Sequence, residues 1–266
     1  MFSYHNHTKF SDGASDIEEL IIGATRNKLR EVGISDHYVQ HPNNIDVSWS
    51  MTKGKIKPYF EKISKLRDLY SNKIIVKKGI ELDFFKENID SVYDYIISFE
   101  PDYIIGSVHY IENFLLDENK EEWTTLSKEQ IENLIKEYWK KILEMALSNK
   151  VNIIAHIDIY KKFGYFTDKD FTSDIINALE AIKANKQSVE INTSGFFKPV
   201  NEYYPSMNII KQIAQMEIPV IITADAHCPA HIKRNFSEVY KIIKEMGITT
   251  TCRYEKLHPI IEKFAK

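Results

Sequence analysis

The sequence predicts an α/β fold, a TIM-like (β/α)7 barrel with a metal site at the C-terminal ends of its strands. Apolar runs of strand length alternate with segments of helical periodicity about seven times, at intervals of roughly 30 to 45 residues, as in parallel strands joined by crossover helices. Some runs, such as 218–222, are apolar throughout, which is typical of strands buried on both faces. Polar residues follow almost every run. This favours a closed or nearly closed barrel, where strand ends surround one mouth, over an open doubly wound sheet.

The first half of the chain predicts four strand–helix units. Strands are expected near 2–4, 31–35, 73–80 and 102–108, and helices near 17–24, 54–70, 88–97 and from 127 onward. Ser15 with Glu18 and Ser127 with Gln130 have the spacing of a capping box, so each pair is expected to begin a helix. The polar stretch 111–126 indicates an active-site loop.

The second half predicts three more units and a tail. Strands are expected near 151–155, 188–191 and 218–223, and helices near 174–184, 206–216 and after a cap formed by Asn235 with Glu238. The tail from Ile248 is expected to add a short strand and a helix. No linker or composition shift divides the 266 residues, so we expect one barrel domain over residues 1–266.

Composition excludes several classes of protein. The formal net charge is −3 and the basic residues are spread along the chain, which gives no electrostatic case for binding nucleic acid or an anionic membrane. The two cysteines, Cys228 and Cys252, match no zinc or disulfide pattern and are expected to be reduced thiols. No leader segment or membrane span is indicated. We therefore expect a cytoplasmic protein, and leave its oligomeric state open.

Ionisable side chains gather at the predicted strand ends. The set is His5, His7, Asp12, Asp36, His37, Glu81, His109, His156, Asp225 and His227. Residues i and i+2 of a strand project to the same face, so His5 and His7 would point into one pocket. Each residue alone could be a turn cap or a core histidine. Together they indicate bound cations, because burying so many ionisable groups is prohibitive unless cations neutralise the carboxylates.

The ligand types restrict the metal. Imidazole and carboxylate groups without thiolate favour Zn, Mn or Fe. The number of candidate ligands exceeds what one or two ions can use, so we expect three divalent ions, with Glu81 or a water bridging two of them.

Seven short segments carry a family resemblance: His5-x-His7, Ser11-Asp12-Gly13, Ser35-Asp36-His37, Gly79-Ile80-Glu81, Gly106-Ser107-Val108-His109, Ala155-His156 and Asp225-Ala226-His227. Together they resemble the PHP (polymerase and histidinol phosphatase) family over residues 1 to about 250. The loops at 191–195 and 204–206 are similar to those of its histidinol-phosphatase branch. The resemblance implies a distorted seven-stranded barrel with a trinuclear metal centre.

The resemblance also implies how the ligands are shared. His5, His7, Glu81 and Asp225 would hold one ion. Glu81, His109 and His156 would hold the second, and Asp12, His37 and His227 the third.

The activity implied is hydrolysis of L-histidinol phosphate, a small phosphorylated amino alcohol, to L-histidinol and phosphate in histidine biosynthesis. Attack by a hydroxide that bridges the ions is expected, because clustered dications lower the pKa of water and hold the phosphoryl oxygens. Two alternatives remain: a phosphoesterase for phosphotyrosine or nucleotides, and a non-catalytic metal-binding domain as in some polymerases.

Other site roles are less determined by the sequence. Asp225, His227 and Asp36 are the catalytic candidates, and the acid that protonates the leaving group is left open among Asp36, Asp225 and His231. The candidates for binding substrate are Arg234, Lys198 and His231; ordinary surface charge explains the two basic residues equally well. Asp158, Glu112 and Asp83 are possible partners for the substrate amine.

Overall fold

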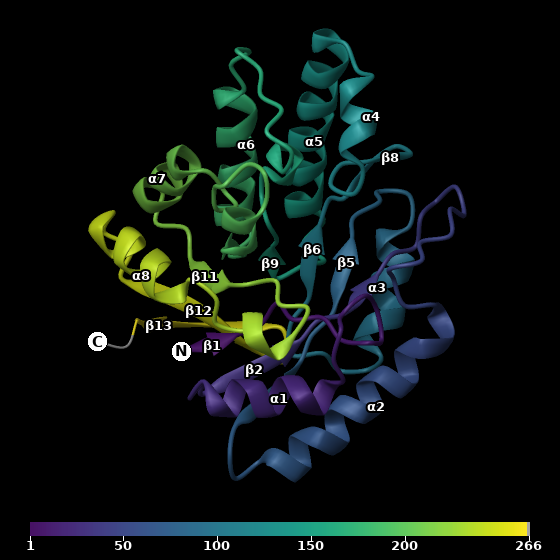
Figure 1. The fold of residues 1–266 in the computed structure, drawn as a ribbon, viewed down its shortest axis with the longest axis vertical. Coiled ribbons are helices and arrows are strands. Elements are labelled where there is room, and N and C mark those ends of the chain that lie inside the picture. The colour runs from purple at the N-terminus through teal and green to yellow at the C-terminus, as the bar shows by residue number, and fades with distance from the viewer. Residues whose placement is uncertain (265–266) are drawn as a thin grey trace.

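Parallel strands form the centre of the molecule in a computed structural model that describes residues 1–264 (Figure 1). The strands are β1 (Phe2–Ser3), β2 (Glu31–Ile34), β3 (His37–Tyr38), β4 (Ile75–Lys78), β5 (Glu81–Asp83), β6 (Ile105–Ser107), β9 (Ile153–Ile154), β10 (Ser188–Asn192) and β11 (Val220–Thr223). Every pairing among them is parallel. After a short break, β3 continues the line of β2 and β5 continues that of β4.

A single backbone bridge closes the ring. Asn6, beyond the end of β1, pairs with Ala226, beyond the end of β11. The backbone N–H of His7 donates to the Ala226 carbonyl at 2.9 Å, and the Ala226 N–H donates to the His5 carbonyl at 3.1 Å. Seven parallel strand lines therefore surround one axis, and the predicted α/β barrel fold is confirmed.

The barrel is distorted where β11 changes neighbour. At its N-terminal end β11 pairs with β12 (Thr250–Glu255) through Val220 and Thr251, instead of with β1. β12 in turn pairs antiparallel with β13 (His258–Lys263). The helix predicted in this tail was wrong: Lys256 and Leu257 both have positive φ and form the two-residue turn of a hairpin.

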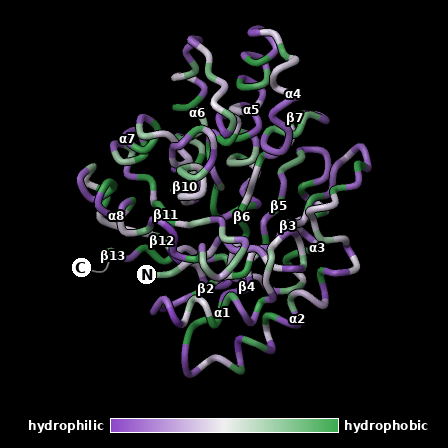
Figure 2. Tube along the Cα trace, viewed as in Figure 1, coloured by the Kyte–Doolittle hydropathy of each residue, from purple (hydrophilic) through white to green (hydrophobic). Residues whose placement is uncertain are grey.

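Helices pack around the outside of the ring. They are α1 (Ile17–Arg26), α2 (Lys53–Tyr70), α3 (Ile89–Ile97), α5 (Lys128–Ser148), α6 (Thr172–Ala184), α7 (Met207–Gln215) and α8 (Phe236–Glu245). Hydrophobic and hydrophilic residues alternate along them (Figure 2), as expected of helices with one buried face. Within residues 1–264, none of the helices combines the length and apolar character that a membrane span needs.

The predicted helix starts were partly correct. Ser127 and Gln130 form the expected capping box. The box of α1 lies one residue later than predicted, at Asp16 and Glu19. Asn235 precedes α8 in a left-handed conformation, and its side chain donates to the Tyr203 hydroxyl instead of capping the helix.

The predicted loop at 111–126 contains regular structure. A small hairpin of β7 (Tyr110–Ile111) and β8 (Phe114–Leu115) is followed by the short helix α4 (Lys120–Thr124). Short 3-10 turns occur in three other loops at the same end of the barrel: η1 (Ile159–Lys161), η2 (Ser194–Phe197) and η3 (Pro229–His231).

Aromatic side chains fill the barrel interior. A buried cluster inside the ring contains Phe2, Tyr4, Tyr103, Ile105, Ile153, Ala155, Ile221, Cys252 and Tyr254. The rings of Tyr4 and Tyr103 stack with their centroids 4.8 Å apart. The interior is therefore a packed core beneath the mouth and not a channel.

Two glycines make room for the ring of Tyr103. A Cβ on Gly33 would lie 2.0 Å from the Tyr103 hydroxyl oxygen, and one on Gly79 would lie 2.1 Å from its Cζ. We expect Gly79→Ala to lower the free energy of unfolding by about 1–3 kcal/mol, because the extra methyl overpacks a rigid core. Urea unfolding measures this change.

Gly54→Ala is the matched control. Gly54 lies in the first turn of α2 with open space around it, so alanine there should leave stability unchanged or raise it slightly. Equal unfolding free energies for the Gly54 and Gly79 variants would contradict the packing described.

Candidate metal centre

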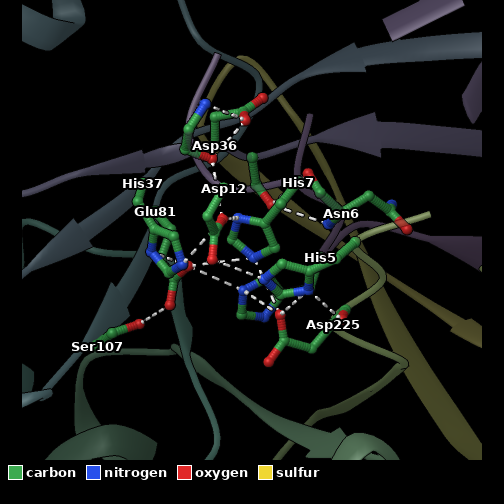
Figure 3. A network of polar contacts seen from close by, with 12 residues as sticks. His5, Asn6, His7, Asp12, Asp36, His37, Glu81, Ser107 and Asp225 are labelled. Atoms are coloured by element: carbon green, nitrogen blue, oxygen red, sulfur yellow. Dashed lines mark hydrogen bonds and ion pairs between the residues drawn. The ribbon is translucent and has the colours of Figure 1, made fainter. Parts of the chain in front are cut away.

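The nine predicted metal ligands gather at the mouth of the barrel, beside the C-terminal ends of the strands. Figure 3 shows His5, His7, Asp12, His37, Glu81 and Asp225 pointing toward one another. They are His5, His7, Asp12, His37, Glu81, His109, His156, Asp225 and His227. His5 and His7 project to the same side of the chain beyond β1, as the two-residue period requires. Asn6 between them points away, and its side-chain amide donates to the Gly33 carbonyl at 2.8 Å.

Glu81 lies at the centre of the cluster. Its Oε2 is 3.0 Å from Nε2 of His5, 3.4 Å from Nε2 of His7 and 2.8 Å from Nδ1 of His37. Its Oε1 is 3.1 Å from Nε2 of His156. The side chain is buried, and each oxygen faces a different set of imidazoles. This carboxylate is therefore placed where it could bridge two ions.

Two further carboxylates complete the cluster on its more open side. Asp225 Oδ1 lies 3.0 Å from Nε2 of His7 and 3.6 Å from Nε2 of His5. Asp12 Oδ2 lies 3.0 Å from Nε2 of His227, and its Oδ1 lies 3.8 Å from Nε2 of His37. The donor atoms of His7, Asp12, His37 and His227 are all within 4.8 Å of one another, which is close enough for one ion to contact all four.

The chemistry of these donors fits a metal. His7 is fully buried, yet neither ring nitrogen has a hydrogen-bond partner among the described residues. Burial, together with neighbouring His37 and His227, lowers the pKa of His7 to about 4, so its imidazole is neutral and offers a lone pair. Burial opposes the charge of Glu81, but His37 and His5 hold its pKa well below the ordinary value. Imidazole nitrogens beside ionised carboxylates are the donor types that suit Zn, Mn or Fe.

Two further carboxylates orient candidate ligand histidines. The sequence did not predict this role for either of them. Glu190 Oε1 lies 2.5 Å from Nδ1 of His5, and its Oε2 accepts from the backbone N–H of His156 at 2.7 Å. Asp83 Oδ1 lies 2.8 Å from Nδ1 of His109. In His5 and His109 this leaves Nε2 facing Glu81. An acidic residue inside the apolar strand 188–191 is the signal that could have identified Glu190.

Replacing Glu190 with glutamine tests this support. We expect Glu190→Gln to weaken metal binding by about 10- to 100-fold, because carboxylates that orient ligand histidines contribute that much to affinity. Competition with a chromophoric chelator measures the change.

Glu31→Gln serves as its control. Glu31 is equally buried, but it lies at the opposite end of the barrel and accepts from the Tyr4 hydroxyl. Its variant should keep the wild-type metal affinity. If both variants bind metal as the wild type does, Glu190 has no orienting role.

Asp36 has a different position from the one predicted. Asp36 lies in the break between β2 and β3, and its carboxylate turns away from the mouth into which His37 points, toward Thr8 and Ser11. Its Oδ1 accepts from the Thr8 N–H at 2.7 Å and from the Ser11 hydroxyl at 2.6 Å, and it is fully buried. The assignment of Asp36 as a catalytic acid is therefore corrected: its carboxylate orders the loop that carries Asp12.

A cavity of about 420 Å³ opens directly above the candidate metal ligands. Its walls combine exposed ligands with charged and aromatic residues of the surrounding loops: Asp12, His37, Trp49, His109, Asp117, Glu118, Ile159, Lys162, Ser194, Lys198, Tyr204, Asp225 and His227. The candidate ligands Asp225 and His227 are thus accessible to a small molecule in this cavity.

Only one of the three predicted substrate-binding residues lines the cavity. Lys198 does so. The guanidinium of Arg234 lies over the Phe197 ring, 3.1 Å from its centroid, outside the cavity wall. His231 is also outside, although its pKa is lowered by partial burial and by the positive charges of Arg234 and His227.

The three acids predicted as amine partners lie elsewhere. Asp83 bonds to His109, Asp158 forms a buried ion pair with a neighbouring lysine, and Glu112 is exposed outside the cavity. Apart from the candidate ligands Asp12 and Asp225, the acids that line the cavity are Asp117 and Glu118. Both follow β8 within the segment predicted as an active-site loop, but nothing in their spacing distinguished them from other acids there.

Comparison with known proteins identifies the family. The profile of the PHP domain matches residues 3–194, which include seven of the nine candidate ligands. The chain belongs to the PHP domain family. A probable histidinol-phosphatase of Deinococcus radiodurans is 28% identical to this PHP domain over 257 residues, covering 96% of this chain and 97% of that protein.

Two further proteins are similar to this PHP domain. The structure of histidinol phosphate phosphatase from Lactococcus lactis, complexed with zinc, L-histidinol and phosphate, has a TM-score of 0.82 and 21% identity, covering 97% of this chain and 98% of that one. The DNA polymerase/3'-5' exonuclease PolX of Bacillus subtilis is 26% identical over 84% of this chain, but only 33% of that protein is matched.

Proposed function

We propose that this PHP domain is a metal-dependent phosphatase that hydrolyses L-histidinol phosphate to L-histidinol and phosphate. The main observation that supports this function is a cavity lined by both acidic and basic side chains, which lies above the cluster of nine candidate ligands. The relative named as a probable histidinol-phosphatase is matched along nearly its whole length, whereas the polymerase is matched over a third of its length. These matches support the phosphatase over the non-catalytic role.

We propose that the cluster holds three divalent ions, Zn, Mn or Fe. His5, His7, Glu81 and Asp225 would hold one, Glu81 with His109 and His156 the second, and Asp12 with His37 and His227 the third. The groups of donors within 4.8 Å of one another support this division in part: Asp12, His37 and His227 form one group together with His7, and His5, His7 and Asp225 form another. Glu81 belongs to two groups, one with His5 and His156 and one with His37 and His109. When bound, such ions supply a water of lowered pKa and charge stabilisation for the phosphoryl oxygens.

The residues of the cavity wall bind the rest of the substrate in this proposal. Lys198 and Lys162 provide positive charge for the phosphate group. Asp117 and Glu118 provide negative charge for the ammonium group, and Trp49 offers an aromatic face for the imidazole. Asp117 Oδ2 also accepts from the Lys162 ammonium at 3.0 Å, so the two kinds of contact lie next to each other.

Replacing Asp117 with asparagine tests the amine contact. We expect Asp117→Asn to raise KM for L-histidinol phosphate by roughly tenfold, because a charge-assisted hydrogen bond becomes a neutral one. KM for p-nitrophenyl phosphate, which has no amine, should change much less, because asparagine can still accept from Lys162. Steady-state phosphate release measures both values.

The control is Glu112→Gln, which removes an acid of the same segment outside the cavity. It should leave both KM values at the wild-type level. Equal increases for the two substrates in the Asp117 variant would contradict an amine contact.

A substrate panel tests the proposed function. The metal-loaded protein should hydrolyse L-histidinol phosphate with kcat/KM at least about a hundredfold above that for phosphotyrosine or nucleoside monophosphates, because only the first presents the ammonium group that the acids recognise. A preference for phosphotyrosine or for nucleotides would replace the proposal with the corresponding phosphoesterase. A metal-loaded folded chain without activity on any ester would favour the structural role.

A further inference from the structure

Tyr204 lines the active-site cavity from the loop between β10 and α7. Its backbone is fixed by a two-way bridge to Asn192, with hydrogen bonds of 2.7 and 3.1 Å. Its ring packs against Gly195, where a Cβ would lie 2.8 Å from the ring. The side chain is therefore held in one position, and only 2% of the residue is exposed.

The hydroxyl of this buried tyrosine has no hydrogen-bond partner among the described residues. Buried hydroxyls are normally paired, and one left unpaired is destabilising, so an unpaired hydroxyl in the wall of a cavity points to a ligand. Burial and the nearby carboxylates of Asp158, Asp117 and Asp225 raise the pKa of Tyr204 far above its ordinary value. The hydroxyl therefore keeps its proton and remains a donor.

The neighbours of Tyr204 indicate which part of a ligand it meets. Ser194 and Lys198 belong to the same loop and line the same cavity, so this wall presents hydrogen-bond donors. Asp225, a candidate metal ligand, is close enough to influence the phenol and also lines the cavity. The acceptor that fits between a donor wall and a metal site is an oxygen of a phosphoryl group.

We propose that the Tyr204 hydroxyl donates a hydrogen bond to a phosphoryl oxygen of the ester bound in the cavity. This inference rests on the proposed phosphatase function and adds a substrate contact to it.

The test is Tyr204→Phe in the metal-loaded protein, compared with wild type at equal metal content. Since the hydroxyl has no partner within the described chain, its removal should leave folding intact. We expect the affinity for inorganic phosphate, measured by calorimetry, to fall by about 10- to 100-fold, the range for a hydrogen bond to a charged group. We expect kcat/KM to fall by a similar factor for both L-histidinol phosphate and p-nitrophenyl phosphate, because both esters present the same phosphoryl group.

Tyr203→Phe is the matched control. Its hydroxyl accepts from Asn235 outside the cavity, so phosphate affinity should stay at the wild-type value. Unchanged phosphate affinity in the Tyr204 variant would overturn the inference, as would a loss confined to L-histidinol phosphate. If wild type does not hydrolyse L-histidinol phosphate while the variant still loses phosphate affinity, the proposed substrate fails and the phosphoryl contact stands.

Discussion

Glu81→Gln is expected to lower kcat/KM for L-histidinol phosphate by at least about a thousandfold and to reduce the metal content of the purified protein. The Glu81 carboxylate lies within 3.4 Å of nitrogens from His5, His7, His37 and His156. Glutamine keeps the shape of the side chain but removes the negative charge that two ions would share. Its amide nitrogen also presents protons toward imidazoles that must offer lone pairs. Metal content by inductively coupled plasma mass spectrometry and phosphate release measure the two effects.

Glu31→Gln again provides the control, since it neutralises a carboxylate of equal burial at the far end of the same barrel. That variant should retain its metal and its activity. A Glu81→Gln protein with full metal content and wild-type kinetics would show that the carboxylate at the centre of the cluster is not a ligand.

His7→Ala is expected to lose about one metal ion per chain and to reduce activity by at least about a hundredfold, while the barrel remains folded. Neither ring nitrogen of His7 has a hydrogen-bond partner in the described chain, so the substitution breaks no hydrogen bond of the imidazole. What it removes is a neutral imidazole 3.0 Å from Asp225 and stacked on His37 and His227. Mass spectrometry of the metal and circular dichroism separate the loss of the ion from loss of fold.

His41→Ala is the matched control for that variant. His41 is also buried, but its Nε2 lies 2.9 Å from the Glu112 carbonyl, outside the ligand cluster. The His41 variant should keep all of its metal even if it is less stable. Equal metal content in the His7 and His41 variants would contradict the role assigned to His7.

The fold was predictable because the pattern that encodes it is local. Alternating apolar runs and helical periodicity located the seven strand lines, and polar residues after each run located the mouth. The distortion was not predictable in the same way. It arises because the N-terminal end of β11 pairs with β12, whereas Ala226, beyond its C-terminal end, pairs with Asn6. Asn6 is far from β11 in the sequence, so local patterns do not reveal this pairing.

The candidate metal ligands were predicted mainly by position, since all of them except Asp12 begin a strand or follow the end of one that faces the mouth. Asp36 shows the limit of that argument. It lies next to His37, in the break between β2 and β3, and its side chain points away from the mouth into which His37 points. Its four donors from the Thr8 and Ser11 region became visible only with the loop in place.

The residues that line the substrate cavity depend on loop conformations. Asp117 and Tyr204 come from loops whose paths are fixed by contacts distant in sequence, such as the bridge from Tyr204 to Asn192. Arg234 follows the candidate ligand His227 by seven positions, but its guanidinium stacks on Phe197 outside the cavity. Lys198 lines the cavity instead. Spacing along the chain could not distinguish these two cations.

The metal content of the wild-type protein tests the central claim most directly. After reconstitution with zinc or manganese and removal of free metal, mass spectrometry should find about three ions per chain, and a chelator should remove them together with the activity. A folded chain that binds none, or that hydrolyses L-histidinol phosphate equally well after complete removal of the metal, would contradict the account of this site.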